Sequence, residues 1–181
     1  VSQGKYSIVS AVASGIHVDF SDSAAALKHI LASVDGKTIR GVIGTDDATV
    51  ELASRVADHL GLIHNDPLAS LFSRRKDKAR QCLRAAGLPV PRFECIDLEQ
   101  DGPIVNSSVP FPCVVKPVCL SGSRGVIRVN DSFSLQQACT RIKRILEDEE
   151  DLDEWERTHV LLEEYIHGPE FAFEGILSNG R

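Results

Sequence analysis

The sequence reads Phe111-Pro-Cys-Val-Val-Lys-Pro-Val118 and then, two residues later, Ser121-Gly-Ser-Arg-Gly-Val126. The first block predicts a short apolar strand in which Lys116 shares a face with Val114 and Val118. A lysine among valines needs an anion, because a buried charge without a partner is costly. The second block is a loop whose glycines let the backbone approach closely and whose successive N–H groups can bind oxyanions. Together they indicate a phosphate site, and a hairpin with a flexible turn and a snorkelling lysine is the alternative.

Carboxylates stand on two further segments with strand-like patterns. Val160–Ile166 has apolar residues on both faces and one carboxylate on each, Glu163 and Glu164. Glu170–Leu177 is expected to form the next strand, with Glu170 on the face opposite its core side. The expected core face consists of Phe171, Phe173 and Leu177.

A helix is predicted from about Arg74 to Ala86, because Gly87 and then Pro89 form a good C-terminal stop signal. Lys76 and Lys78 both fall in its first turn, where cations oppose the helix dipole. Helical angle alone does not choose between the two lysines, and a solvated basic turn is the other interpretation. The expected apolar stripe consists of Ala79, Cys82, Leu83 and Ala86.

The first 66 residues alternate between strand and helix patterns, which predicts a small parallel sheet. Ser23–Val34 is an expected helix and Ile39–Gly44 an expected strand. The turn Thr45-Asp46-Asp47 is expected to open a helix that runs to Leu60. Either Thr45 or Asp46 can cap that helix. Substrate contact is the alternative role, since open α/β sheets bind ligands beyond strand ends.

Arg92–Tyr165 is expected to form a small α+β lobe with one helix, Ser132–Glu147. Its predicted strands lie near residues 93–96, 113–118, 125–129 and 160–165, and a loop covers residues 101–110. Glu147–Glu156 holds eight acids in ten residues, a run expected to stay solvated and mobile, with Trp155 anchoring its far end.

Composition narrows the function classes. The net charge of −6 argues against a general nucleic-acid binder, whose binding surface should be basic. No apolar run reaches the length of a membrane span, so no membrane contact is expected. The five cysteines form no CxxC pair and predict free buried thiols in the reducing cytoplasm. The six histidines lack metal-ligand spacing.

Taken together, these segments resemble the ATP-grasp superfamily. The resemblance runs from about residue 40 to the end and rests on the order of its motifs. A lysine precedes AGLPVP (Ala86–Pro91), the VVKP strand and its Gly/Ser loop follow, and LLEEYIHGPEF (Leu161–Phe171) comes last. The carboxylate–amine ligases of the L-amino-acid ligase and carnosine-synthase type are the most similar, and D-alanine–D-alanine ligase and biotin carboxylase are more distant.

The resemblance implies roles at matching positions. Lys76, eleven residues before Gly87, and Lys116 match the two lysines that bind the phosphates of ATP. Glu163 matches the carboxylate near the adenine amino group, and Glu164 and Ile166 match the hinge whose backbone meets the adenine edge. Glu170 matches the carboxylate that accepts the ribose hydroxyls. The flexible loop that closes over the phosphates corresponds to Ser121, Gly122, Ser123, Arg124 and Gly125.

The implied fold is α/β and then α+β, with an incomplete parallel-sheet pre-ATP-grasp domain at 1–66 and a connecting helix segment at 67–91. The small ATP-grasp lobe spans 92–165, and a truncated second lobe starts at 166–181. The Mg²⁺ ligands, a Glu and a Glu-x-Asn pair, are expected after Arg181, so no catalytic residue is expected within the chain.

The implied parent protein is an ATP-dependent carboxylate–amine ligase. Its substrates would be a small carboxylate and an amine, with amino acids expected, and a homodimer is compatible with the family. A non-catalytic ATP-binding regulatory module with the same fold is the alternative. A biotin-dependent carboxylase is a weaker third option.

Overall fold

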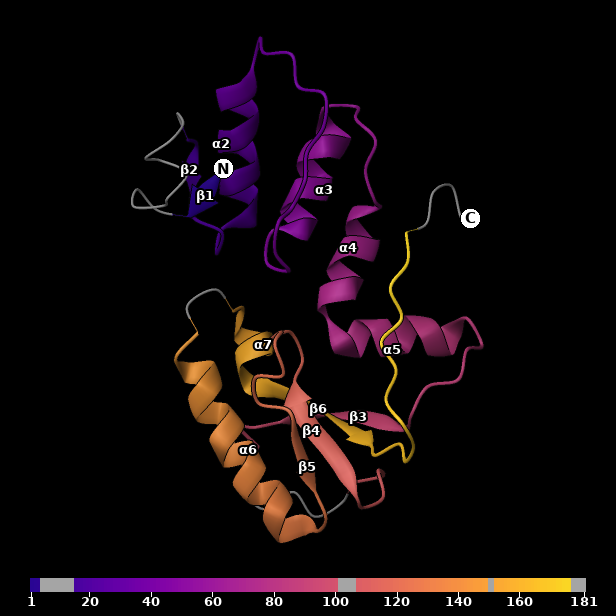
Figure 1. Ribbon diagram of the computed structural model, residues 1–181. Coiled ribbons are helices and arrows are strands. Elements are labelled where there is room, and N and C mark those ends of the chain that lie inside the picture. Colours follow the sequence, from indigo (N-terminus) through magenta and orange to yellow (C-terminus); the bar gives the residue numbers. More distant parts are fainter. Residues whose placement is uncertain (4–14, 101–106, 150–151, 177–181) are drawn as a thin grey trace.

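The computed structural model describes residues 1–3, 15–100, 107–149 and 152–176. Leu177 and residues 101–106 of the predicted loop therefore lie outside the described part of the chain. In Figure 1 an N-terminal unit is followed by two connecting helices and then by a lobe built on a sheet.

The N-terminal unit joins a short sheet to two helices. β1 (Ser2–Gln3) pairs in parallel with β2 (His17–Val18), as the strand–helix alternation predicts. α2 (Ser23–Val34) has the predicted bounds, and the Asp22 side chain caps it by accepting from the amide of Ala25. α3 spans Val50–His59. The core of the unit consists of Val18, Ala26, Ile30, Leu52 and Val56.

The strand predicted at Ile39–Gly44 is wrong. These residues lie outside any helix or strand and join no sheet within the described part of the chain, and Ile43 is 87% exposed. A strand is defined by pairing, and no described neighbour supplies the partner. The following helix also starts later than predicted, because Asp46 caps a preceding turn by accepting from the amide of Thr49 at 3.0 Å.

The helix predicted from about Arg74 to Ala86 is confirmed as α5 (Lys76–Ala85), and a separate helix, α4 (Pro67–Arg74), precedes it. They meet at Arg75, whose backbone is extended (φ −91°, ψ 101°). Gly87, at φ +74°, follows α5 as expected. The predicted apolar stripe is wrong in part, since Cys82 and Ala86 are exposed and the buried residue of α5 is Asp77.

The C-terminal lobe contains an antiparallel sheet in the order β3-β6-β4-β5. Its strands are β3 (Phe93–Asp97), β4 (Cys113–Pro117), β5 (Ile127–Val129) and β6 (His159–Glu164). All four predicted strands are thus confirmed, with β5 shorter than expected. α6 (Ser132–Glu147) has the predicted bounds and lies against one face of the sheet (Figure 1).

The alternation of the strands divides the sheet residues between two environments. Val115 and Leu162 pack under Leu135 and Ile142 of α6, and all four side chains are fully buried. The opposite face carries Leu161 together with the polar Lys116 and Glu163. One face of the sheet therefore builds the core, and the other presents charge toward α5.

Ile142→Ala should strongly destabilise this lobe. Ile142 has no exposed area, so the substitution leaves a cavity and is expected to cost about 2–5 kcal/mol in free energy of unfolding, measured by urea denaturation. Phe133→Ala is the matched control on the same helix, because Phe133 is 71% exposed and should change stability by no more than about 0.5 kcal/mol. Equal losses from the two variants would contradict this packing.

The acidic run is not wholly solvated. Its last residues form α7 (Glu154–Thr158), where Asp153 and Glu156 make a capping box. Glu156 is 1% exposed and accepts from Arg74, so the expectation of a solvated run is wrong at this position. The anchoring role predicted for Trp155 is confirmed, because its ring stacks on His159 and lies beneath Arg75.

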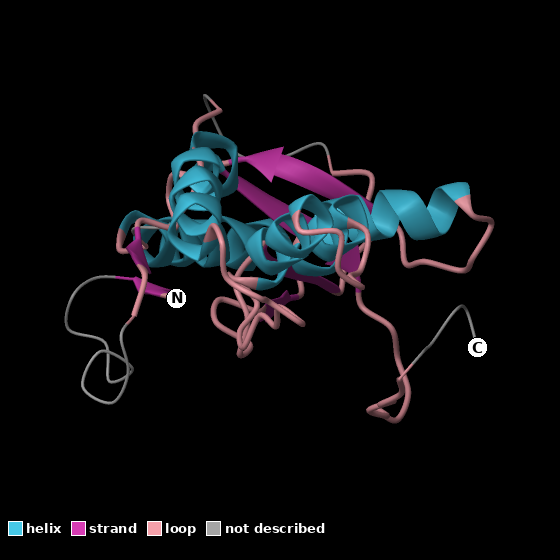
Figure 2. Cartoon of the chain, turned by 90° about the horizontal axis from the view of Figure 1, so that it is seen from above, coloured by secondary structure: helices cyan, strands magenta, loops and turns pink. Residues whose placement is uncertain are grey.

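The strand predicted from Glu170 is also wrong. Residues 165–176 are loop throughout, drawn in pink in Figure 2. Phe171 and Phe173, expected to face a core, are 85% and 94% exposed. The described chain places no second strand or helix over them, so their alternating pattern has nothing to pack against.

Candidate functional site

Lys116 and Glu163 meet on the face of the sheet opposite α6. In the β4–β6 register, Lys116 lies opposite Leu161, and Glu163 lies opposite Val114, which makes the two charged residues diagonal neighbours. Their side chains form a direct ion pair, Lys116 Nζ with Glu163 Oε2. Glu163 is 5% exposed. The anion that a lysine among valines requires is therefore supplied, in this conformation, by the protein itself.

A second cation shares the same carboxylate. Arg80 of α5 donates from Nε to Glu163 Oε1 at 2.5 Å. Arg80 is not among the residues predicted for the site, although the sequence contains a usable signal for it. Arg80 lies four residues after Lys76 on the predicted helix, and residues with that spacing share a helix face.

Lys76 reaches the end of β4 through two hydrogen bonds. Its backbone amide donates to the Val118 carbonyl at 2.8 Å, and its ammonium group donates to the Leu120 carbonyl at 2.5 Å. Burial, and then repulsion from Lys116, lower the pKa of Lys76 below its ordinary value. Cys119, Asp47 and Glu163 offset part of this lowering.

The cluster contains more positive than negative charge. Lys76, Arg80 and Lys116 contribute three cations, while the carboxylate of Glu163 pairs with Arg80 and Lys116 and attracts Lys76 from further away. The side chain of Lys116 is 15% exposed and that of Arg80 is 28% exposed, so water screens them incompletely. A multiply charged anion such as a polyphosphate would balance this excess.

The Gly/Ser loop follows directly on this cluster. Gly122, Ser123 and Gly125 have φ values of 63°, 59° and 73°. A Cβ at Gly125 would lie 3.0 Å from ring atoms of Pro117, so a side chain there would displace the strand residue next to Lys116. The loop thus folds back closely onto the end of β4.

Part of the loop is engaged within the protein. The amides of Arg124 and Val126 donate to the carbonyls of Ser121 and Ser123, at 3.3 and 3.2 Å. The Arg124 guanidinium forms an exposed ion pair with Glu149, with one contact at 3.2 Å. In this conformation those two amides do not contribute to an oxyanion nest.

The remaining predicted residues do not join the cluster. Glu164 lies at the end of β6, 3.8 Å from the Arg92 guanidinium, with its side chain 36% exposed. Ile166 is 67% exposed, and Glu170 is exposed in the loop beyond the sheet. In the part of the chain that the structure describes, no side-chain hydrogen bond or ion pair links Glu164, Ile166 or Glu170 to Lys116 or Glu163.

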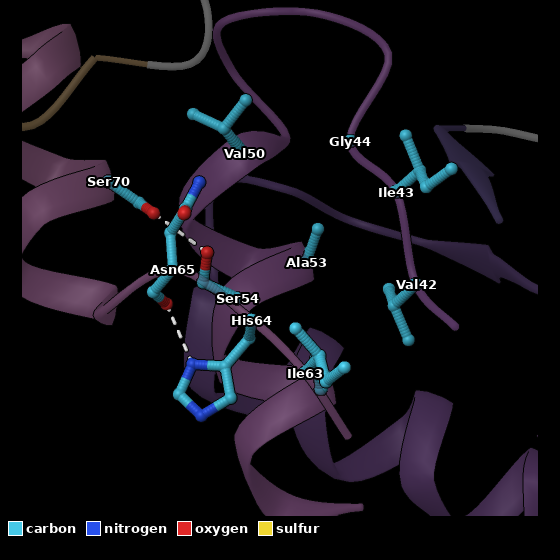
Figure 3. Close-up of a pocket in the computed structure, with 11 residues that line it drawn as sticks. Val42, Ile43, Gly44, Val50, Ala53, Ser54, Ile63, His64, Asn65 and Ser70 are labelled. Atoms are coloured by element: carbon cyan, nitrogen blue, oxygen red, sulfur yellow. Dashed lines mark hydrogen bonds between the residues drawn. The ribbon is translucent and has the colours of Figure 1, made fainter. Parts of the chain in front are cut away.

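Two surface hollows border the N-terminal unit rather than the charged cluster. One, of about 350 Å³, is bordered by α3 and by residues 42–44 and 63–65 (Figure 3). Ser54 and Ser70 are hydrogen-bonded there at 2.7 Å. The other, of about 600 Å³, is bordered by Thr45 and Asp46. Asp46 acts as a turn cap there, and substrate contact at this turn stays a prediction.

All five cysteines are free, and Cys113, Cys119 and Cys139 are buried, whereas Cys82 and Cys95 are exposed, contrary to prediction. Burial raises the pKa of Cys119 to about 12, so its thiol is protonated at neutral pH.

Across the ranges that the structure describes, no three His, Cys, Asp or Glu side chains gather as a metal site. None of the described helices is both long and apolar enough to cross a bilayer.

The lobe that carries the cluster matches a known family. The model described as "ATP-grasp domain" covers residues 109–181, which include β4, the Gly/Ser loop and β6. Residues 109–181 are therefore similar to an ATP-grasp domain. The resemblance stated from the motifs is therefore confirmed.

Similar proteins include ligases. The D-alanine–D-alanine ligase of Pseudomonas entomophila is 32% identical over 105 residues, 58% of this chain and 30% of that protein. The corresponding enzyme of Pseudomonas putida is 31% identical over 105 residues, again 58% of this chain and 30% of that protein. The L-amino acid ligase of Bacillus licheniformis superimposes with a TM-score of 0.67 at 25% identity, over 83% of this chain and 35% of that structure. The ATP-grasp fold is thus shared, and the chain spans about a third of each relative.

Proposed function

We propose that this chain is the ATP-binding part of an ATP-dependent carboxylate–amine ligase. The observation that carries the proposal is the charged cluster, in which Arg80 and Lys116 contact the buried Glu163 and Lys76 is bonded to the Leu120 carbonyl at the start of the Gly/Ser loop. The similarity to D-alanine–D-alanine and L-amino acid ligases supports the reaction class and favours amino acids as substrates. A homodimer remains compatible with this proposal.

In the proposed reaction, a substrate carboxylate attacks the γ-phosphorus of ATP, giving an acylphosphate and ADP. An amine then attacks the acyl carbon, and phosphate leaves as the amide forms. Lys76 and Lys116 would neutralise and orient the phosphates, which is the main requirement of phosphoryl transfer. Closure of the loop Ser121–Gly125 would keep water from the acylphosphate.

Glu163 would accept a hydrogen bond from the adenine amino group, with Lys116 and Arg80 holding its carboxylate in place. Backbone groups of Glu164 and Ile166 would meet the adenine edge, and Glu170 would accept the ribose hydroxyls. The last two residues lie in the exposed loop after β6, so nucleotide binding would have to order that segment.

Mg²⁺ would supply charge neutralisation in such a reaction, and the described residues do not gather three His, Cys, Asp or Glu side chains that could hold it. The proposed organisation is a pre-ATP-grasp domain at 1–66, a connecting segment at 67–91, the small ATP-grasp lobe at 92–165 and the start of the second lobe at 166–181. The free thiols fit a reducing cytoplasm.

The direct test is ADP release by the full-length protein across a panel of amino acid pairs. The proposal expects ADP and an amide product to appear in equal amounts for at least one pair. ATP binding without turnover on any pair would favour the non-catalytic binding module instead.

As the pH rises, ATP affinity should begin to fall at a lower pH than it would if the phosphate-binding lysine had an ordinary pKa. The pKa of Lys76 lies below 10.5, so its ammonium group loses its proton, and its attraction for phosphate, at a lower pH. Titrating the ATP dissociation constant between about pH 8 and 10 checks this. In the Lys76→Arg variant the side chain stays charged across this pH range. The fall in ATP affinity should therefore begin at a higher pH than in the wild-type protein. Superimposable curves for the two proteins would exclude Lys76 as the titrating group.

A further inference from the structure

Helix α7 places two side chains against the junction of α4 and α5. Glu156 accepts from Arg74 Nη2 at 2.5 Å, and its Oε1 lies 3.6 Å from Arg75 Nη1. The Arg75 guanidinium carbon lies 4.4 Å from the centre of the Trp155 ring, within the range of a cation–π contact. These contacts join residues about 80 positions apart in the chain.

The same junction carries Lys76. Arg75 donates to both carboxylate oxygens of Asp77, at 2.9 and 3.0 Å, and Asp77 is 1% exposed. Lys76 lies between these two residues and is the first residue of α5. The residues on either side of the lysine are therefore fixed by a bidentate ion pair, which is geometrically specific.

The small lobe holds the lysine from the other side. Both the amide and the ammonium group of Lys76 donate to carbonyls that follow β4, those of Val118 and Leu120. The position of the ammonium group thus depends on how the α4–α5 junction sits against the small lobe. Glu156 and Trp155 make the side-chain contacts from α7 that fix that junction.

We propose that Glu156 is a positioning residue for Lys76, acting through Arg74 and Arg75 with support from Trp155. The inference rests on the proposed function, in which Lys76 binds phosphate. Lys76 is then held in a fixed position relative to the small lobe, although it lies on a connecting helix. Lys76 and Lys116 would keep their relative position whenever that lobe moves over the nucleotide.

Loss of the Glu156 charge would release the junction. Glu156→Gln keeps the size of the side chain but leaves two arginines without the buried carboxylate that they approach. The first turn of α5 would then shift, and Lys76 would leave the Leu120 carbonyl. Arg80 and Lys116 contact Glu163 independently, so the base-binding side of the site should be little affected.

The test compares nucleotides that differ in phosphate content, using calorimetry on the full-length protein. Glu156→Gln should lower the affinity for ATP and for ADP by about tenfold, while the affinity for adenosine should change by less than about twofold. Glu154→Gln on the same helix is the matched control and should leave all three affinities unchanged, because Glu154 is exposed. With Lys76→Met already present, Glu156→Gln should have no further effect on ATP affinity.

A second readout does not depend on nucleotide. Competitive chemical labelling gives the pKa of Lys76, which should move toward 10.5 in Glu156→Gln as the ammonium group enters water. If the wild-type protein bound no ATP, the proposed function would fail, and this titration would still decide the positioning role.

Three results would overturn the inference. They are equal losses for adenosine and ATP, additive losses in the Lys76→Met background, and an unchanged Lys76 titration. Trp155→Leu provides a second variant if Glu156→Gln does not fold. It removes the ring under Arg75 and leaves the Glu156 carboxylate in place, and it should show the same pattern with a loss of about threefold.

Discussion

Lys116→Ala is expected to abolish detectable ATP turnover and to weaken ATP binding by at least about 100-fold. Lys116 is the cation that β4 itself contributes, and the loop that would enclose the phosphates folds back onto Pro117, the next residue of the strand. Its removal also leaves the buried Glu163 with Arg80 as its remaining partner in the cluster. The site would then repel a triphosphate more strongly than before.

Lys143→Ala is the control, because Lys143 forms an ion pair with Glu99 on the surface and lies outside the cluster. Its ATP affinity and turnover should match those of the wild-type protein. Circular dichroism should show that both variants are folded. Wild-type affinity and rate in Lys116→Ala would remove Lys116 from the site, and with it the main support for the proposed ligase.

The small lobe is the part of the fold that the sequence predicts best. The bounds of α6 follow from local signals, since Asp131 caps its start and its apolar residues recur at helical spacing. The β4 and β6 segments are recognisable because both are short apolar runs with single charges at marked positions. Their partners lie within the lobe, so local pattern and tertiary contact agree.

The prediction fails where an element needs a partner that the described chain does not provide. Ile39–Gly44 and Glu170–Leu177 have strand-like patterns, yet the described residues of both are unpaired. The extended residue Arg75, directly before α5, depends on a contact that no local pattern shows. Its guanidinium pairs locally with Asp77, but it also lies over the ring of Trp155 from α7, about 80 residues further along the chain.

The site itself is predicted only in part. Lys76, Lys116 and Glu163 do come together, but the resemblance that singles them out cannot show that Arg80 completes the cluster. Glu156 is hidden for a related reason. It stands among eight acids whose composition predicts solvation, and only the packing of α7 against Arg74 distinguishes it from the others.

Glu163→Gln should give the largest loss of stability among the charged residues of the site. Glu163 is buried and neutralises two cations, so removing its charge leaves Lys116 and Arg80 close together without compensation. Breaking a buried pair from one side costs about 3–5 kcal/mol in free energy of unfolding. Urea denaturation measures that loss. The surface carboxylate Glu99, changed to Gln, should cost no more than about 1 kcal/mol although it too has a lysine partner.

A polyanion should reverse part of this loss. Tripolyphosphate carries the charge of the ATP phosphates without the base, and it would supply the anion that the three remaining cations lack. Its addition should therefore raise the melting temperature of Glu163→Gln more than that of the wild-type protein, whereas Lys116→Ala should respond least. If tripolyphosphate stabilised all three proteins equally, the cations of α5 and β4 would not form one phosphate site. The charge excess around Glu163 would then be a feature of folding alone.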